Sequence, residues 1–212
     1  MSFSPPLIID LDGTLIKTDM LHESALRALR DRPGSVLCVP KWLAQGKAVL
    51  KQRLASSLVF DPESLPYNEQ LLNWLKQQKK EGRTLILCTA SDRSIAEAIG
   101  AHLGIFDEVM ASDGNINLSG SHKADSLESR FGRGGFDYAG NSSVDLAVWR
   151  KARRAIVVNA KADLPAKAAE CCEVETVFPP VKHGVRVWRR VLRMHQWLSL
   201  IHISEPTRPL YI

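Results

Sequence analysis

Cysteine is scarce in this chain, which has four cysteines among 212 residues. No two of them form a C-x-x-C pair, and no group of His and Cys residues has the spacing of zinc ligands. The sequence therefore indicates neither a zinc site nor a disulfide framework. Because no signal peptide is recognisable at the N-terminus, we expect a reduced, cytosolic setting.

Acidic residues are missing from residues 182–198, which carry five basic ones. Residues 1–181 hold 22 residues of each sign, so the net charge of +5 comes entirely from this short segment. A nucleic-acid-binding protein needs positive charge spread over a face of its fold. We therefore expect no nucleic acid partner, and a local role for the basic segment.

The rest of the chain alternates apolar strand patterns with amphipathic helix patterns. Hydrophobic residues make up 45% and charged residues 24%, which are ordinary values for a globular domain. The predicted strands are 7–11, 84–89, 107–110, 136–139, 155–159 and 173–178. The predicted helices are 68–80, 92–103, 144–153 and 163–172. This alternation predicts an α/β fold, in which helices cover both faces of a parallel sheet and all strand C-termini lie at one edge.

Residues 20–66 interrupt the alternation. They contain two helical patterns, 20–31 and 39–58, and no convincing strand. We interpret this segment as a small helical cap inserted over the edge of the sheet. Ordinary packing helices are the alternative. The predicted core domain then consists of residues 1–19 and 67–180.

The first strand runs directly into two acids, Asp10 and Asp12, which are followed by a Gly-Thr turn. Asp and Gly favour turns, so this stretch alone is consistent with a simple turn. Two carboxylates in this arrangement also suit a nucleophile and an acid/base partner. The choice depends on what the ends of the other strands supply.

A second polar group follows the strand that ends near Cys88. Thr89, Ala90 and Ser91 come just before a predicted helix, where a hydroxyl and backbone N–H groups can hold a phosphate. Ser, Thr and Asp are also the common N-cap residues, so the signal is weak alone. Further along, Lys123 would by itself be a solvated surface lysine.

The last group, Asn141 and Asp145, follows the strand 136–139 and Gly140. Asp145 has two interpretations when taken alone. It either begins or caps the next helix, or it contributes a carboxylate to a site at the end of the strand. The order and context of all four groups decide between these interpretations.

Together, the four groups resemble the motifs of the haloacid dehalogenase (HAD) superfamily of phosphotransferases, over residues 7 to about 178. The resemblance implies a Rossmann-like domain with its active site at the strand C-termini. The implied catalytic residues are Asp10 as nucleophile, Asp12 as general acid/base, Thr89 and Lys123. The implied phosphate-binding residues are Thr89, Ala90, Ser91 and Lys123, and the implied Mg²⁺ ligands are Asp10, Asp12, Asn141 and Asp145.

The chemistry of phosphate transfer agrees with these roles, with one departure. A phosphate dianion repels a carboxylate nucleophile, and Mg²⁺ with a lysine ammonium would neutralise both. The family's acidic motif usually begins Gly-Asp, whereas this chain has Gly140-Asn141. A neutral amide oxygen is a weaker magnesium ligand than a carboxylate. We therefore expect reduced metal affinity.

The segment 181–198 reads VKHGVRVWRRVLRMHQWL, a basic amphipathic stretch typical of a membrane-surface or partner-docking segment. A helix packed on the domain is the alternative. Around residues 193–197 it also resembles the run-in to the first transmembrane helix of UbiA-type polyprenyl transferases, some of which carry a HAD-like domain in front. No span of about 20 apolar residues follows. The tail 199–212 is similar to translated sequencing-adapter DNA, so we expect the natural chain to continue beyond Leu198.

The sequence thus predicts a magnesium-dependent phosphohydrolase that acts on a phosphorylated small molecule or a polyprenyl-linked substrate. We expect it to work at the cytoplasmic face of a membrane, as the N-terminal domain of a longer polyprenyl transferase. Two alternatives stay open. One is a weak or inactive HAD-like binding or regulatory domain, which Asn141 favours, and the other is a stand-alone cytosolic phosphatase.

Overall fold

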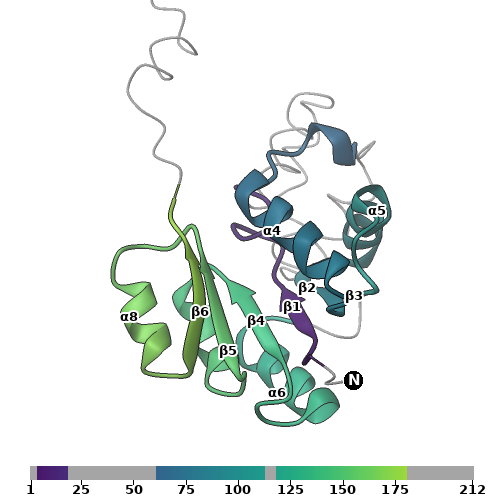
Figure 1. Ribbon diagram of the computed structural model, residues 1–212. Coiled ribbons are helices and arrows are strands. Elements are labelled where there is room, and N and C mark those ends of the chain that lie inside the picture. The colour runs from purple at the N-terminus through teal and green to yellow at the C-terminus, as the bar shows by residue number, and fades with distance from the viewer. Residues whose placement is uncertain (1–3, 19–60, 113–117, 181–212) are drawn as a thin grey trace, which may run out of the picture. The chain divides into compact units, whose positions relative to one another are not determined.

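The computed structural model describes residues 4–18, 61–112 and 118–180 (Figure 1). The chain divides after Pro180 into two units, and every described residue lies in the first. The predicted cap helices, the basic segment and the tail are outside the described residues: 20–31, 39–58, 181–198 and 199–212.

The described residues build a six-stranded sheet in the order β3-β2-β1-β4-β5-β6, and every neighbouring pair is parallel. The strands are β1 (Leu7–Ile9), β2 (Leu85–Asp92), β3 (Glu108–Ser112), β4 (Asp137–Gly140), β5 (Arg154–Val158) and β6 (Glu173–Phe178). All six lie where the sequence predicted strands, and the α/β fold class is confirmed. The strand that comes first in the chain is central, because β1 pairs with both β2 and β4.

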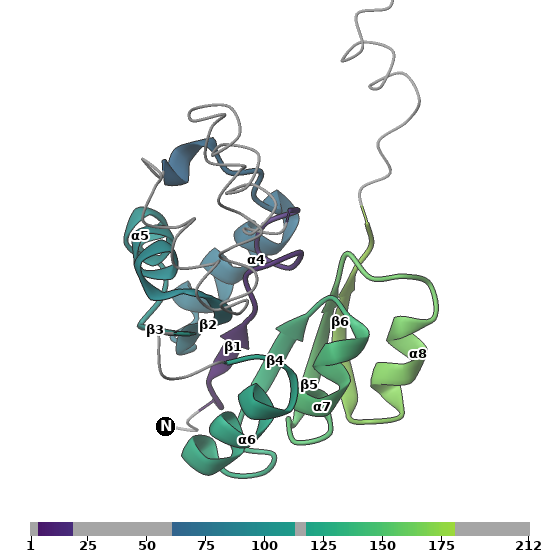
Figure 2. The same cartoon turned by 180° about the vertical axis from the view of Figure 1, so that it is seen from behind.

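Helices cover both faces of the sheet, as a comparison of Figures 1 and 2 shows. They are α4 (Glu69–Lys80), α5 (Arg93–Leu103), α6 (Gly120–Phe131), α7 (Leu146–Trp149) and α8 (Leu164–Ala169). Side chains alternate across a strand, so Leu7 and Ile9 join the core under α4 and α5, while Ile8 joins the core under α6, α7 and α8. Within the three described ranges, no helix is both long and apolar enough to cross a membrane.

One helix was not predicted, and one predicted helix is shorter than expected. We did not predict α6, although Ala124, Leu127 and Phe131 have the i, i+3, i+7 spacing of one helical face. The predicted helix 144–153 is instead a short 3-10 turn, η3 (Ser143–Asp145), followed by one turn of α7. After Trp149 the backbone hydrogen bonds mix the i−4 and i−3 spacings: the N–H of Lys151 donates to the Val148 carbonyl, and the N–H of Ala152 donates to the carbonyls of both Val148 and Trp149.

Short backbone contacts join the two sides of the interruption between residues 18 and 61. Ile16 and Tyr67 form an antiparallel bridge, and the N–H of Lys17 donates to the carbonyl of Pro66 at 3.0 Å. The N–H of Asn68 donates to the carbonyl of Leu15 at 2.9 Å. The chain therefore leaves and re-enters the core at one place, beside the loop that follows β1.

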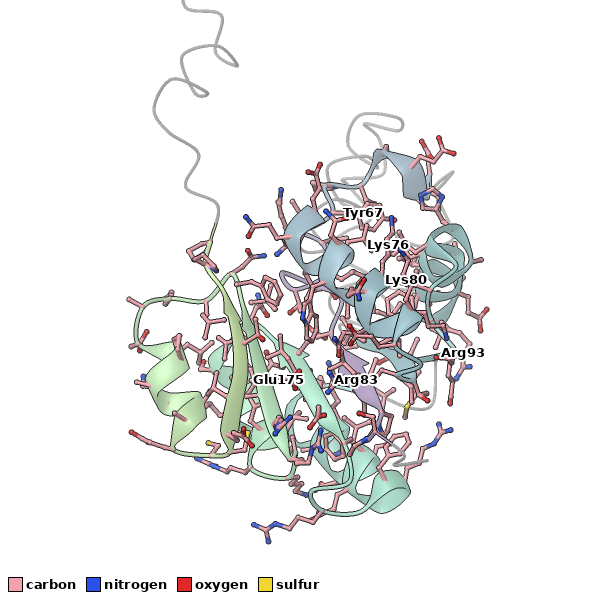
Figure 3. All side chains as sticks on the ribbon, in the orientation of Figure 1. Tyr67, Lys76, Lys80, Arg83, Arg93 and Glu175 are labelled. Atoms are coloured by element: carbon pink, nitrogen blue, oxygen red, sulfur yellow. The ribbon has the colours of Figure 1, made fainter. Side chains whose placement is uncertain are left out.

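A buried ionic cluster closes the amino-terminal edge of the sheet, opposite the strand C-termini. Asp137 is fully buried and accepts hydrogen bonds from Arg153 Nε at 2.9 Å and from the guanidinium of Arg83. Arg83 also pairs with Glu175 of β6 at 3.2 Å, and Figure 3 labels both residues. These charges pair with one another across the strands at this edge, although the buried Nε of Arg83 has no hydrogen-bond partner.

Candidate functional site

The predicted site residues gather at the carboxyl edge of the central strands. Asp10 follows β1, Ser91 lies near the end of β2, Asn141 follows β4, and Lys123 lies on α6. Lys123 and Asp10 are 113 residues apart in the chain, yet the ammonium Nζ lies 2.6 Å from Asp10 Oδ1. The helix that sequence reasoning missed thus delivers the only cation within 4 Å of the Asp10 carboxylate among the described residues.

Lys123 is buried, with 5% of its surface exposed. Its ammonium donates to three acceptors: Asp10 Oδ1 at 2.6 Å, the Cys88 carbonyl at 3.2 Å and the Tyr138 hydroxyl at 3.1 Å. Burial is the largest single effect and disfavours the ammonium, but Asp10, Cys88 and Asp145 together outweigh it and raise the pKa of Lys123. All three ammonium hydrogens therefore have protein partners, and the charge persists at neutral pH.

Asp10 is also buried, with 8% of its surface exposed. Burial raises its pKa to about 6, with Asp145 and Asp12 adding to the rise and Lys123 opposing it. The carboxylate is mostly ionised at neutral pH, next to a fixed cation. A desolvated carboxylate of this kind is chemically suited to act as a nucleophile.

Asp12 is held by hydroxyl groups from the end of β2. Its Oδ2 accepts from Ser91 Oγ at 2.7 Å and from Thr89 Oγ1 at 3.4 Å. Thr89 Oγ1 in turn accepts from the backbone N–H of Ser91 at 3.0 Å, so this N–H, predicted to hold phosphate, has a partner in the protein. Ala90, also predicted to hold phosphate, lies between them and is half-buried.

Asp145 folds back over the loop after β4. Its Oδ2 accepts from the backbone N–H groups of Asn141 at 3.1 Å and Ser142 at 3.0 Å, and from Ser142 Oγ at 3.0 Å. Its Oδ1 accepts from the Tyr138 hydroxyl at 2.9 Å. Gly140 makes room for this arrangement, because a Cβ there would lie 2.7 Å from Asp145 Cγ. The hydrogen bonds of Asp145 are thus those of a capping residue.

Asn141 lies against the loop that carries the two acids of β1. Its Nδ2 would be 2.0 Å from a Cβ on Gly13, which has a φ of +75° that favours glycine. On its other side, the Gly13 carbonyl accepts from Asn159 Nδ2 at 3.0 Å. Asn159 follows β5 and has a φ of 49°, the one positive value at a non-glycine residue in the described ranges. Asn141 therefore packs against this loop at Gly13, and Asn159 holds it by a hydrogen bond.

A magnesium ion was predicted at Asp10, Asp12, Asn141 and Asp145. In the part of the chain that the structure describes, no three His, Cys, Asp or Glu side chains form a ready ligand cluster. The donors are nevertheless hard oxygens, and three carboxylates face one ammonium, that of Lys123, so the charge balance favours a cation. Since Asp145 already accepts four hydrogen bonds, the residues best suited to contact the ion are Asp10 and Asn141. The donor set fits a weakly held magnesium ion.

Sequence reasoning missed two side chains of this edge, Tyr138 and Asn159. Tyr138 lies next to the buried Asp137 in the short strand β4, and no local sequence pattern singled it out. Burial raises the pKa of Tyr138 well above its usual value, with Asp145 adding to the effect, so its hydroxyl keeps its hydrogen. Asn159 gave no signal beyond its place at the end of a predicted strand.

No protein-family model matches the chain. Among curated proteins, the uncharacterized protein y4nM of Sinorhizobium fredii (strain NBRC 101917 / NGR234) is 40% identical over 203 residues. The match covers 95% of this chain but 39% of that protein, so the chain spans about two fifths of the length of this relative.

Several solved structures share the fold. A protein of unknown function from Bordetella pertussis Tohama I superposes with a TM-score of 0.60 at 15% identity, over 82% of this chain and 97% of that one. A substrate-bound phosphoserine phosphatase superposes with a TM-score of 0.55 at 16% identity, over 90% of this chain and 98% of that one. The haloacid dehalogenase-like hydrolase SP0104 of Streptococcus pneumoniae superposes with a TM-score of 0.57 at 13% identity, over 90% of this chain and 100% of that one. At these identities the likeness shows the fold, which is that of the HAD hydrolases.

Proposed function

We propose that this chain is a HAD-type phosphohydrolase that works through an aspartyl-phosphate. The observation that carries the proposal is the buried pair of Asp10 and Lys123, with Nζ 2.6 Å from Oδ1, at the carboxyl edge of a HAD fold. A fixed cation beside a desolvated carboxylate is what attack on a phosphate dianion requires. The likeness of the fold to that of the substrate-bound phosphoserine phosphatase adds support.

In the proposed reaction, a carboxylate oxygen of Asp10 attacks phosphorus and the ester P–O bond breaks. Asp12 gives its proton to the departing alkoxide, so that the product leaves as an alcohol. Asp12 then takes a proton from water, whose oxygen attacks the acyl phosphate and releases inorganic phosphate. Ser91 and Thr89 orient Asp12 for both steps, and the Lys123 ammonium offsets the charge that accumulates on the phosphate oxygens.

Asp10 and Asn141 would hold a magnesium ion, with the charges of Asp12 and Asp145 nearby. The bound ion would neutralise the phosphate dianion as it approaches the nucleophile. The neutral amide of Asn141 makes this a weak site in the proposal, so the activity should need magnesium concentrations above those of a fully acidic ligand set.

The proposed substrate is a phosphate monoester, either on a small molecule or on a polyprenyl-linked sugar. The second choice follows from the resemblance of residues 181–198 to the start of a UbiA-type polyprenyl transferase. The five basic residues of that segment suit the cytoplasmic surface of a membrane. A tethered phosphatase would meet a product of the transferase at high effective concentration.

A second candidate is a HAD-like domain that binds a partner without catalysis. The observation that favours it is Asn141, which lacks the charge that the metal site of the family usually has. The HAD fold would then position another protein or domain. This candidate predicts that phosphate esters are not turned over at any magnesium concentration.

Hydrolysis of an aryl phosphate tests both candidates. Wild-type protein, Asp10→Asn and the control Asp125→Asn are compared over a magnesium titration; Asp125 is an exposed residue paired with Lys151. The proposal expects activity in the wild type and the control, and loss in Asp10→Asn. Equal activity in all three contradicts Asp10 as nucleophile, while no activity in any of them supports the binding domain.

The substrate class needs a separate comparison. Purified protein is incubated with a phosphoribosyl-polyprenyl phosphate in detergent and with soluble sugar phosphates, and released phosphate is measured. Faster release from the lipid-linked substrate supports the membrane context. Cleavage of the soluble esters alone would rule out the polyprenyl-linked substrate and favour a small-molecule phosphatase.

A further inference from the structure

Tyr138 is a fully buried polar residue in the middle of the central strand β4. Its ring packs edge-on against Trp149, with ring centroids 6.4 Å apart, and its carbonyl accepts from Trp149 Nε1 at 3.0 Å. On the other side, a Cβ on Gly140 would lie 2.9 Å from the ring carbon Cε1. These contacts fix the ring, so its hydroxyl oxygen has one position.

The hydroxyl lies between two charged groups, and the direction of both hydrogen bonds follows from their chemistry. The Lys123 ammonium can only donate, so the hydroxyl accepts from Nζ at 3.1 Å. The single phenol hydrogen is then donated to Asp145 Oδ1 at 2.9 Å. A phenylalanine would fill the same space without a buried polar group to satisfy, so packing alone does not account for a tyrosine here.

The two bonds connect the nucleophile to the loop after β4. Asp10 pairs with Lys123, Lys123 donates to Tyr138, and Tyr138 donates to Asp145. Asp145 Oδ2 then holds the N–H of Asn141 at 3.1 Å. These hydrogen bonds form a continuous chain that is buried as far as Asp145, and Tyr138 is the member that joins its two halves.

We propose that Tyr138 is a positioning residue, whose hydroxyl aligns the Lys123 ammonium on Asp10 and, through Asp145, fixes the loop that presents Asn141. The alignment itself is a property of the fold. Its consequence for catalysis rests on the proposed phosphohydrolase function, so the two are tested by different measurements.

The alignment is measured by hydrogen exchange of the Lys123 ammonium, followed by ¹⁵N–¹H NMR at low temperature and assigned with Lys123→Met. Wild-type protein should give ammonium hydrogens that exchange far more slowly than those of the exposed Lys76. Loss of one hydrogen bond to a charged group should speed their exchange by about tenfold or more in Tyr138→Phe. The control Tyr67→Phe also deletes a bonded hydroxyl, which donates to the Pro62 carbonyl at 2.9 Å, and should change nothing.

The catalytic consequence is measured with an aryl phosphate. Tyr138→Phe should lower kcat by about tenfold to a hundredfold with KM within about twofold, and raise the magnesium half-saturation by several-fold. Tyr67→Phe should keep wild-type values. A purely structural role would instead lower the thermal midpoint while leaving kcat and the magnesium requirement of the folded protein unchanged.

The outcomes separate the two proposals. Exchange in Tyr138→Phe at the wild-type rate overturns the positioning role, whatever the activity. If Tyr138→Phe does not fold, wild-type exchange as fast as that of Lys76 overturns it instead. Accelerated exchange in a protein whose wild type hydrolyses no phosphate ester supports the positioning role and overturns the proposed activity alone. Accelerated exchange with unchanged kcat overturns the catalytic consequence.

Discussion

Replacing Asn141 by Asp tests how the carboxyl edge holds a cation. The change keeps the shape of the side chain. Shape matters because the Asn141 amide packs closely on Gly13: a Cβ added to Gly13 would lie 2.0 Å from Asn141 Nδ2. It adds one negative charge to a site that already has three carboxylates and one ammonium. The substitution should therefore tighten magnesium binding and strain the metal-free protein.

The magnitude follows from Coulomb's law. A unit charge about 4 Å from a divalent cation gains about 8 kcal/mol at an effective dielectric constant of about 20. Repulsion from Asp10 and Asp145, together with the loss of water around the new carboxylate, offsets most of this gain. We expect a net gain of about 2 kcal/mol, or about a thirtyfold lower magnesium half-saturation.

The assay is a magnesium titration, followed by calorimetry and by aryl phosphate hydrolysis. In EDTA, Asn141→Asp should unfold a few degrees below the wild type, because about 1 kcal/mol corresponds to about 2–4 °C at this size. The matched control is Asn73→Asp, which adds the same charge at an exposed position on α4. Identical magnesium titrations of Asn141→Asp and wild type would refute this account of position 141.

Two further predictions concern pH and the opposite edge of the sheet. The pKa of Asp10 is raised from 3.8 to about 6 in the folded protein, so the folded state holds this proton more tightly than the unfolded state does. The free energy of unfolding of the metal-free protein should therefore fall as the pH rises from about 4 to 6. Activity needs the ionised carboxylate and should rise as the pH passes through about 6, so a flat kcat/KM profile from about pH 5 to 8 contradicts the role of Asp10. Asp137→Asn leaves Arg83 and Arg153 without their buried partner and should lower the free energy of unfolding by about 3 kcal/mol in urea titrations. Glu173→Gln removes only the exposed ion pair with Arg154 and should lower the free energy of unfolding by under about 1 kcal/mol. Equal losses in the two variants would show that the buried cluster is not an anchor.

The sequence was sufficient to predict the strands, because β1, β2 and β5 are short apolar runs and the others adjoin predicted helices in the alternating pattern. Their order in the sheet was not readable from it, because β1 pairs with strands that begin at Leu85 and Asp137, and such pairings depend on the whole fold. The helix α6 was missed because its apolar residues are few and Gly120 precedes them. Lys123 was therefore identified through the HAD resemblance and not through its place on a helix.

Less of the site was predictable, because its bonds join distant parts of the chain. The pairing of Asp10 with Lys123 follows from the resemblance, but the hydrogen bond from the Ser91 hydroxyl to Asp12 does not. The capping interpretation of Asp145 matches its hydrogen bonds, and its role beside a metal ion stays a prediction. The Tyr138 hydroxyl bonds to Lys123 and to Asp145, which lie on different elements, and no local sequence pattern predicts such a connection.

The central place of β1 bears on how the protein is made. The strand that carries Asp10 leaves the ribosome first, but its two neighbours arrive only with Leu85 and Asp137. Contacts between such distant segments form slowly, because long loops must close before any pairing energy is gained. A nascent chain that stops short of β4 holds the first two acids without Tyr138, Asn141 or Asp145. During synthesis, the two acids after β1 therefore meet Tyr138, Asn141 and Asp145 only once the chain has been made through β4 and the turn that follows it.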